Sequence, residues 1–194
     1  YDAVLLALGT HKGVRLPMEG SELPGVLANS DFLRDAAMEK PTGMGRRVIV
    51  LGGGNVAFDC ARTARRLGAE EVHLACLEAR DKMLADEEEI IQAQEEGIQI
   101  HPAHTFEAIV GADHAQGVRF GRVKSFTFDE NRRAIIEKEE NSEYVIEADT
   151  VIFATGQRTD ITPEAGLELG RGNSIAVQPG SLRTSVPGIY ACGD

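Results

Sequence analysis

The chain has 194 residues and a formal net charge of −11 at pH 7, with acidic residues spread along most of its length. This charge argues against a surface for nucleic acid or for an anionic membrane, and no apolar run approaches the ~20 residues that span a bilayer. Because the first residues also lack the basic start of a secretory signal, we expect a cytoplasmic protein of one large domain, or of one domain flanked by parts of another.

The three cysteines do not indicate a redox or disulfide role. Cys60, Cys76 and Cys192 are far apart, odd in number and contain no C-x-x-C pair. Neither a disulfide framework nor a dithiol redox pair is therefore expected. All three are predicted to be small core residues.

The N-terminal part predicts a strand, a connector and a short helix. The apolar residues 1–9 predict a buried strand that ends at a glycine turn. Residues 11–24 are rich in Gly, Pro and charge, which is typical of a connector near a domain boundary. Ser30 and Asp31 are predicted to cap a helix that continues to Met38.

The strongest unit begins with a predicted buried strand at residues 47–51. Three glycines follow it, and then a segment with apolar residues at helical spacing that ends at Gly68. A strand at 71–76, a helix at 86–96 and a strand at 98–101 continue the pattern. This βαβαβ order predicts a parallel sheet.

The remaining elements complete the predicted fold class. Strands at 105–110, 117–128 and 144–147, separated by polar turns, predict an antiparallel excursion. Residues 150–153 then return to the buried sheet pattern, and a segment rich in Gly and Pro follows. The fold class is thus α/β, a Rossmann-like doubly wound parallel sheet with an antiparallel β excursion.

A dinucleotide-binding signature, Gly52-x-Gly54-x-x-Ala57, lies directly after a strand and opens a helix. Gly52 permits a sharp turn, Gly54 leaves room for a pyrophosphate, and the small Ala57 lets the helix approach the strand. The alternative is a glycine turn that only packs a helix on a sheet.

The start of this helix supplies further candidate contacts. Beyond Gly53 the helix offers free N–H groups and the positive end of its dipole to the phosphates. The amides of Asn55 and Val56 are the predicted donors. The side chain of Asn55 has a second interpretation, in which it bonds the opposite loop.

Glu78 is the predicted contact for the adenosine ribose, because it lies just beyond the carboxyl end of the second strand. A carboxylate there repels the 2′-phosphate of NADP, whereas Arg80 could attract it. We therefore expect NAD(H) to be favoured over NADP(H). The alternative is that Glu78 and Arg80 form a solvated surface pair.

Two groups of residues could suggest a metal site, but both have simpler interpretations. His101 and His104 lack a third ligand nearby in sequence. The acidic residues 86–89 suit the first turn of a helix. No metal site is predicted.

These residues carry a resemblance to the two-dinucleotide-binding flavoproteins of the pyridine nucleotide-disulfide oxidoreductase type, and among them to the glutamate synthase small (beta) subunit-like family. The matching segments span nearly the whole chain: residues 7–10, 23–26, 52–62, 83–97, 154–157 and 184–194.

The resemblance implies a division of the chain. Residues 1–24 and 155–194 would be partial FAD-domain segments at the two ends, and residues 25–154 the NAD(P)-binding domain. The resemblance implies contacts to the nicotinamide half from Ala154, Thr155, Gly156 and Gln157, and to the flavin from Gly193 and Asp194.

Two departures from the family pattern matter. The flavin-binding glycine turn before Tyr1 and the helix after Asp194 are missing from this sequence, so the isolated chain is expected to be inactive. Members of the family that use NADPH carry an Arg-Arg pair where this chain has Leu77 and Glu78, which also favours NADH.

The resemblance implies a parent oxidoreductase that passes hydride from NAD(P)H to FAD and on to an iron–sulfur or other acceptor, with an iron–sulfur subunit as a candidate partner. No side chain of this chain is expected to be catalytic. The alternative is a nucleotide-free docking module of a multi-subunit oxidoreductase. A short-chain-type dehydrogenase is excluded, because none of the three tyrosines is followed four residues later by lysine.

Overall fold

The computed structural model describes residues 1–130, 134–162 and 166–193. The chain forms two compact units, which we describe separately. The larger is Val14–Thr155, and the smaller combines Tyr1–Gly13 with Gly156–Asp194. Among the described residues, no helix is long and apolar enough to cross a membrane.

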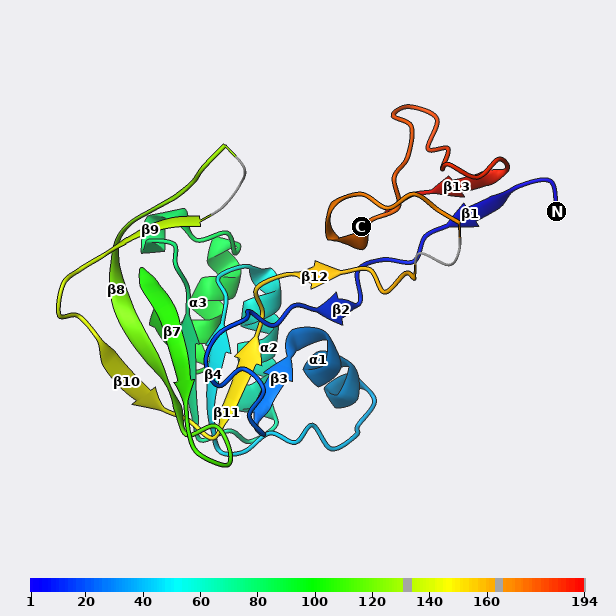
Figure 1. Ribbon diagram of the computed structural model, residues 1–194. Helices are drawn as coiled ribbons and strands as arrows, with labels where there is room; N and C mark the ends of the chain where they lie inside the picture. Colours follow the sequence, from blue (N-terminus) through cyan, green and yellow to red (C-terminus); the bar gives the residue numbers. More distant parts are fainter. Residues whose placement is uncertain (131–133, 163–165, 194) are drawn as a thin grey trace. The chain divides into compact units, whose positions relative to one another are not determined.

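The larger unit is built on a five-stranded sheet in which every neighbouring pair is parallel (Figure 1). Its three central strands are buried except at Arg47 and Glu71, because most of their residues are apolar. In spatial order the strands are β3 (Val26–Ala28), β11 (Thr150–Phe153), β4 (Arg47–Leu51), β5 (Glu71–Ala75) and β6 (Gln99–His101).

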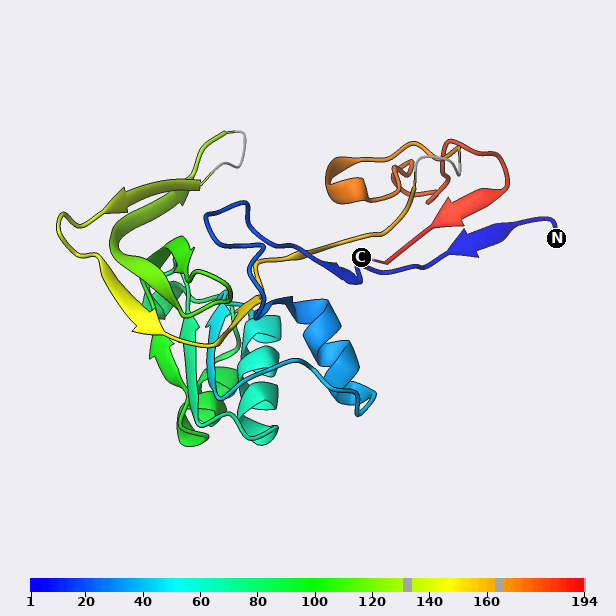
Figure 2. The ribbon, with the colours of Figure 1, turned by 60° about the horizontal axis from the view of Figure 1, so that its bottom comes forward.

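Three helices pack together on one face of this sheet (Figure 2). Alternate residues of β4, Val48 and Val50, share a hydrophobic cluster with Phe58 of the second helix. The helices are α1 (Asn29–Ala37), α2 (Asn55–Arg66) and α3 (Glu87–Glu95).

The antiparallel excursion covers the other face. Ile49 and Leu51 of β4 pack there in a second cluster with Val118 and Phe120. The strands of this antiparallel sheet are β7 (His104–Val110), β8 (Gly117–Phe128), β9 (Ala134–Lys138) and β10 (Tyr144–Glu147). Their order is β10-β8-β7, with β9 paired to β8.

The described residues of the smaller unit form two short strand pairs. Their strands are β1 (Val4–Leu6), β2 (Lys12–Gly13), β12 (Gln157–Arg158) and β13 (Ile189–Ala191). β1 pairs with β13 in parallel, and β2 pairs with β12 antiparallel.

The predicted fold class is confirmed in its α/β architecture, its parallel sheet and its antiparallel excursion. The strands predicted at 47–51, 117–128, 144–147 and 150–153 have the same bounds in the structure. Two strands of the larger unit, and β2 and β12 of the smaller unit, were not predicted from the sequence. β3 is only three residues long, and β9 follows the polar turn at 129–131 too closely to give a separate alternating pattern.

Three local predictions are wrong. The buried strand of residues 1–9 is in fact β1, whose Val4 and Leu5 are exposed. Ser30 and Asp31 do not cap α1, because β3 continues directly into the helix and Ala28 occupies the capping position. Cys60 and Cys76 are buried as expected, but Cys192 is exposed.

Candidate nucleotide-binding site

The carboxyl ends of β4, β5 and β11 meet at one edge of the parallel sheet. Nucleotides bind at this edge in open α/β sheets, because the turns and helix N-termini that follow the strands converge there. Three segments follow the strands at this edge: the glycine turn (residues 52–54), the β5–α3 loop (residues 76–86) and Ala154.

Gly52 joins the neighbouring strands of the site. Its N–H donates to the carbonyl of Ala75 at 2.9 Å, and a Cβ on it would collide with the carbonyl oxygen of Ala154. Its φ of +146° also lies where residues with a side chain are strained. Only glycine fits this position.

Gly54 has the opposite surroundings. It is the N-cap residue of α2, where no side chain caps the helix, and a Cβ on it would have no atom within 4 Å. The first amides of a helix, here those of Asn55 and Val56, have no acceptor within the helix. Ala57 is fully buried and donates to the carbonyl of Gly54 at 2.9 Å. The turn therefore leaves open space in front of the α2 N-terminus, which suits a pyrophosphate.

Glu78 lies beside the glycine turn. A Cβ on Gly53 would stand 3.1 Å from Oε2 of Glu78 and 2.7 Å from Cβ of Cys76. The carbonyl of Glu78 accepts from the N–H of Ala103 at 2.8 Å, which ties this part of the loop to the β6–β7 connection. Glu78 thus stands at the carboxyl end of β5, where the ribose contact is expected.

Arg80 pairs with the first turn of α3 and not with Glu78. Its two terminal nitrogens donate to the carboxylate of Glu87 at 3.0 and 2.6 Å. This hydrogen bond raises the pKa of Arg80 and lowers that of Glu87. Both side chains are exposed, with 41% and 64% relative accessibility.

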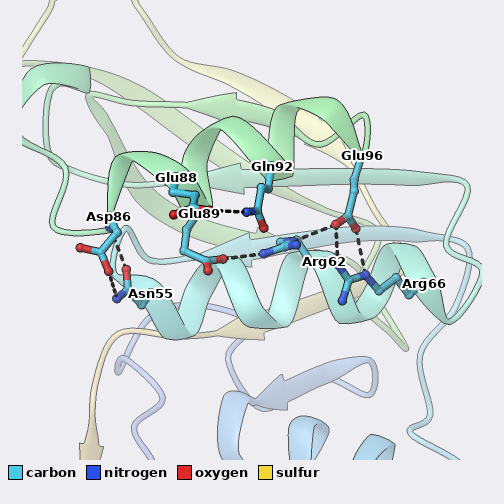
Figure 3. Close-up of polar contacts among 8 residues, drawn as sticks. All are labelled: Asn55, Arg62, Arg66, Asp86, Glu88, Glu89, Gln92 and Glu96. Atoms are coloured by element: carbon cyan, nitrogen blue, oxygen red, sulfur yellow. Dashed lines mark hydrogen bonds and ion pairs between the residues drawn. The ribbon is translucent and has the colours of Figure 1, made fainter.

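Asn55 bonds the opposite loop, as the second interpretation of this residue held. Its Nδ2 donates to Oδ2 of Asp86 at 3.0 Å, and its Oδ1 accepts from the N–H of Asp86 at 2.9 Å (Figure 3). Asp86 was not predicted as a site residue, although its place at the start of a predicted helix could have indicated it.

The segment predicted to approach the nicotinamide crosses from one unit to the other. In the larger unit, Ala154 donates to the carbonyl of Leu51 at 2.8 Å, and Oγ1 of Thr155 donates to that of Val14 at 3.2 Å. In the smaller unit, Gly156 precedes the exposed Gln157 of β12.

The predicted flavin contacts lie at the end of the smaller unit. Gly193 follows β13, and a Cβ on it would have no atom within 4 Å, so a ligand group could approach its backbone. Asp194 lies outside the described residues.

His73 of β5 joins His101 of β6 and His104 of β7 in a histidine cluster, and the part of His73 was not predicted from the sequence. Nδ1 of His73 lies 3.0 Å from Nε2 of His101, and Nε2 of His104 lies 2.9 Å from the Tyr144 hydroxyl. Burial lowers the pKa of His101 to about 4, and the neighbouring His73 and His104 add to the shift. In the described part of the chain, no group of three or more His, Cys, Asp or Glu could hold a metal ion.

The buried thiols are unsuited to nucleophilic chemistry. Burial raises the pKa of both Cys60 and Cys76 to about 12. A thiol with such a pKa is almost entirely protonated near pH 7. The site therefore offers binding groups, with no activated nucleophile among these two residues.

Two curated relatives are similar over the whole chain. The NADP(+)-dependent formate dehydrogenase subunit beta of Moorella thermoacetica is 37% identical over 199 residues, which is 100% of this chain and 28% of the relative. The glutamate synthase [NADPH] small chain of Halomonas elongata is 35% identical over 211 residues, covering 100% and 44%. The resemblance to glutamate synthase small subunits is thus confirmed, and the chain spans less than half the length of both relatives.

A solved structure shows the same fold. Mycobacterium tuberculosis FprA, in a complex with NADPH, has a TM-score of 0.78 and 20% sequence identity, and the likeness covers 100% of this chain and 58% of that one.

The prediction that NAD(H) is favoured over NADP(H) is wrong, because both relatives are named for NADP(+) or NADPH. The prediction depended on Glu78 and on the missing Arg-Arg pair. The structure places Arg80 on the same loop as Glu78. The charge that a 2′-phosphate would meet therefore depends on the guanidinium of Arg80 as well as on the carboxylate of Glu78.

The family model for pyridine nucleotide-disulphide oxidoreductases matches residues 1–194. A glycine turn at the carboxyl edge of a parallel sheet is a common site for dinucleotides. The names of the two relatives also refer to NADP(+) or NADPH. This chain therefore belongs to the pyridine nucleotide-disulphide oxidoreductase family.

Proposed function

We propose that the chain is the nicotinamide-nucleotide-binding part of a flavoprotein oxidoreductase that passes hydride from NADPH to FAD and on to an iron–sulfur or other acceptor. The observation that carries the proposal is the contrast within the glycine turn. Gly52 is enclosed by Ala75 and Ala154, whereas Gly54 faces open space at the N-terminus of α2. A pyrophosphate needs this combination of a fixed turn and an unobstructed helix end.

The residues of the larger unit would bind and orient the nucleotide. The amides of Asn55 and Val56 would donate to the pyrophosphate, and Glu78 would accept from a hydroxyl of the adenosine ribose. Arg80 would leave Glu87 and pair with the 2′-phosphate, because both members of that ion pair are exposed. Ala154 and Thr155 would line the nicotinamide half.

The redox chemistry itself belongs to the cofactors: a bound nicotinamide supplies the hydride and a bound flavin accepts it. The protein contributes position, and none of its side chains needs to act as acid, base or nucleophile. We therefore expect no NADPH oxidation unless FAD is bound.

The assignment of parts to cofactors is also a proposal. Residues 1–24 and 155–194 would belong to an FAD domain and residues 25–154 to the NAD(P) domain, with Gly193 and Asp194 near the flavin. The compact units divide at Gly13 and Thr155. Because the two relatives are named as a subunit and a small chain, an iron–sulfur partner subunit fits the proposal.

Calorimetric titration of the purified chain with NADPH and, separately, with FAD tests the proposal at low ionic strength, where phosphate contacts are least screened. We expect saturable NADPH binding. An absence of NADPH binding would contradict the proposal and favour the nucleotide-free docking module.

A further inference from the structure

The β5–α3 loop, which holds both Glu78 and Arg80, is fastened to the glycine turn at its far end. The N–H of Ala85 donates to the carbonyl of Gly53 at 3.1 Å. One residue later, Asp86 makes the two reciprocal hydrogen bonds with the side chain of Asn55, at 3.0 and 2.9 Å. We name this Asn55–Asp86 pair the latch (Figure 3).

The side chain of Asp86 is committed to the latch. It occupies the N-cap position of α3, where an aspartate ordinarily accepts from the first amides of its own helix. Here it makes no capping hydrogen bond. Its carboxylate bonds Asn55 on α2 instead, so the latch joins the first residue of α2 to the start of α3.

The latch is not required to hold the two helices together. Further along the helices, Arg62 bonds Glu89 at 2.6 Å and Glu96 at 2.9 Å, and Arg66 bonds Glu96 at 2.6 Å (Figure 3). With a rise of 1.5 Å per residue, Arg62 lies about 10 Å along α2 from Asn55. Among these side-chain bonds between α2 and α3, the latch is the one at the end where the nucleotide would bind.

Between its two fastened ends most of the loop is exposed, apart from Met83, which packs against the hydrophobic core. Ala79, Arg80, Asp81, Lys82 and Leu84 are all exposed. Such a segment samples several conformations unless its ends are fixed, and binding then costs the free energy of ordering it.

We propose that Asn55 and Asp86 are positioning residues that preorganise the β5–α3 loop. Glu78 is then held where the adenosine ribose would bind, and Arg80 is held where it can exchange Glu87 for the 2′-phosphate. This inference rests on the proposed NADPH binding. Asn55 acts through its side chain on the loop, in addition to the contact expected from its backbone amide.

The test compares NADPH affinities of variants of the full chain. Asn55→Ala and Asp86→Ala each break the latch, and we expect each to raise the Kd for NADPH about 10-fold, or ~1.4 kcal/mol. The double variant should be no worse than either single one, because all three lack the same interaction. Asp86→Asn keeps an oxygen to accept from Asn55, so it should restore binding to near the wild-type level.

Glu96→Ala is the matched control, because it removes the α2–α3 bonds at the other end of the helices. It should lower the melting temperature without changing the Kd. Hydrogen exchange gives a second measure: Asn55→Ala should speed exchange in residues 79–85 and leave the central strands protected.

The outcomes separate this inference from the proposed function. If the wild-type chain binds NADPH and Asn55→Ala binds it equally well, the latch does not position the loop. Affinity lost equally in Glu96→Ala would show general helix packing and would also overturn the inference. If the wild-type chain does not bind NADPH, the proposed function fails, and this inference fails with it.

Discussion

At the scale of single residues, the two outer glycines of the turn have different physical requirements. Gly52 is restricted by its backbone angle and by Ala154, whereas nothing in the fold restricts Gly54. The signature predicts glycine at both positions. The structure shows that a side chain at the first would collide with Ala154, whereas a Cβ at the second would have no atom within 4 Å.

This difference predicts unequal losses of stability in two matched variants. Gly52→Ala should lose about 1–3 kcal/mol of unfolding free energy, because the added Cβ is strained and collides with Ala154. Gly54→Ala should change it by at most about 1 kcal/mol. Urea unfolding measures both, and equal losses would contradict this account of the turn.

Arg80 is the residue that we expect to distinguish the two nucleotides. Arg80→Gln should raise the Kd for NADPH about 10-fold, because a charge-assisted hydrogen bond to the 2′-phosphate is lost, and should change the Kd for NADH much less. Lys82→Gln, in the same 3-10 turn, is the control. Equal losses for both nucleotides would remove Arg80 from the phosphate contact.

At the scale of elements, the histidine cluster connects the edge strand β6 to the antiparallel sheet. The pKa of His101 is lowered from 6.5 to about 4. Between these two pH values, His101 is therefore protonated in the unfolded chain and neutral in the folded chain. The stability is therefore full above pH 6.5 and falls as the pH drops towards 4. Burial lowers the pKa of His73 too, which acts in the same direction.

We expect His101→Gln to flatten this pH dependence. Melting temperatures at pH 7 and pH 5 should differ less in the variant than in the wild type, since glutamine does not titrate and can still bond His73. If the variant loses as much stability between pH 7 and pH 5 as the wild type does, another group is responsible.

Elements with a continuous apolar run, or with apolar residues at helical spacing, were predictable from the sequence. β4 and β11 consist almost entirely of apolar residues, and α2 has its apolar residues at helical spacing between two glycines. β3 was missed because three residues do not establish a period. The start of α1 was misplaced because Ser30 and Asp31 are common capping residues, but here the strand continues into the helix without a connector.

The parts of the candidate site that are set by the course of the backbone could be predicted from the sequence. The glycine turn and the position of Glu78 follow from the order strand, turn, helix. The Asn55–Asp86 bonds join residues 31 positions apart, and the Arg80–Glu87 pair depends on how the loop folds back on α3. Such side-chain pairings depend on the tertiary structure, and the spacing of apolar residues along the sequence does not predict them.

At the scale of the whole molecule, the larger unit brings the candidate site together by placing the ends of three parallel strands at one edge. The glycine turn, the β5–α3 loop and Ala154 lie between residues 52 and 154 of the sequence. The register of β4 with β5 and with β11 places the ends of these three strands side by side. The larger unit thus contains every residue proposed to bind the pyrophosphate and the adenosine ribose.

The most direct test of this account is an NADPH titration of the wild-type chain beside Gly54→Val, with circular dichroism to confirm that the variant is folded. A valine at residue 54 would extend into the space in front of α2, where its Cβ would have no atom within 4 Å. We predict saturable binding by the wild type and no detectable binding by the folded variant. Equal binding by both proteins would show that the pyrophosphate lies elsewhere and would contradict the account.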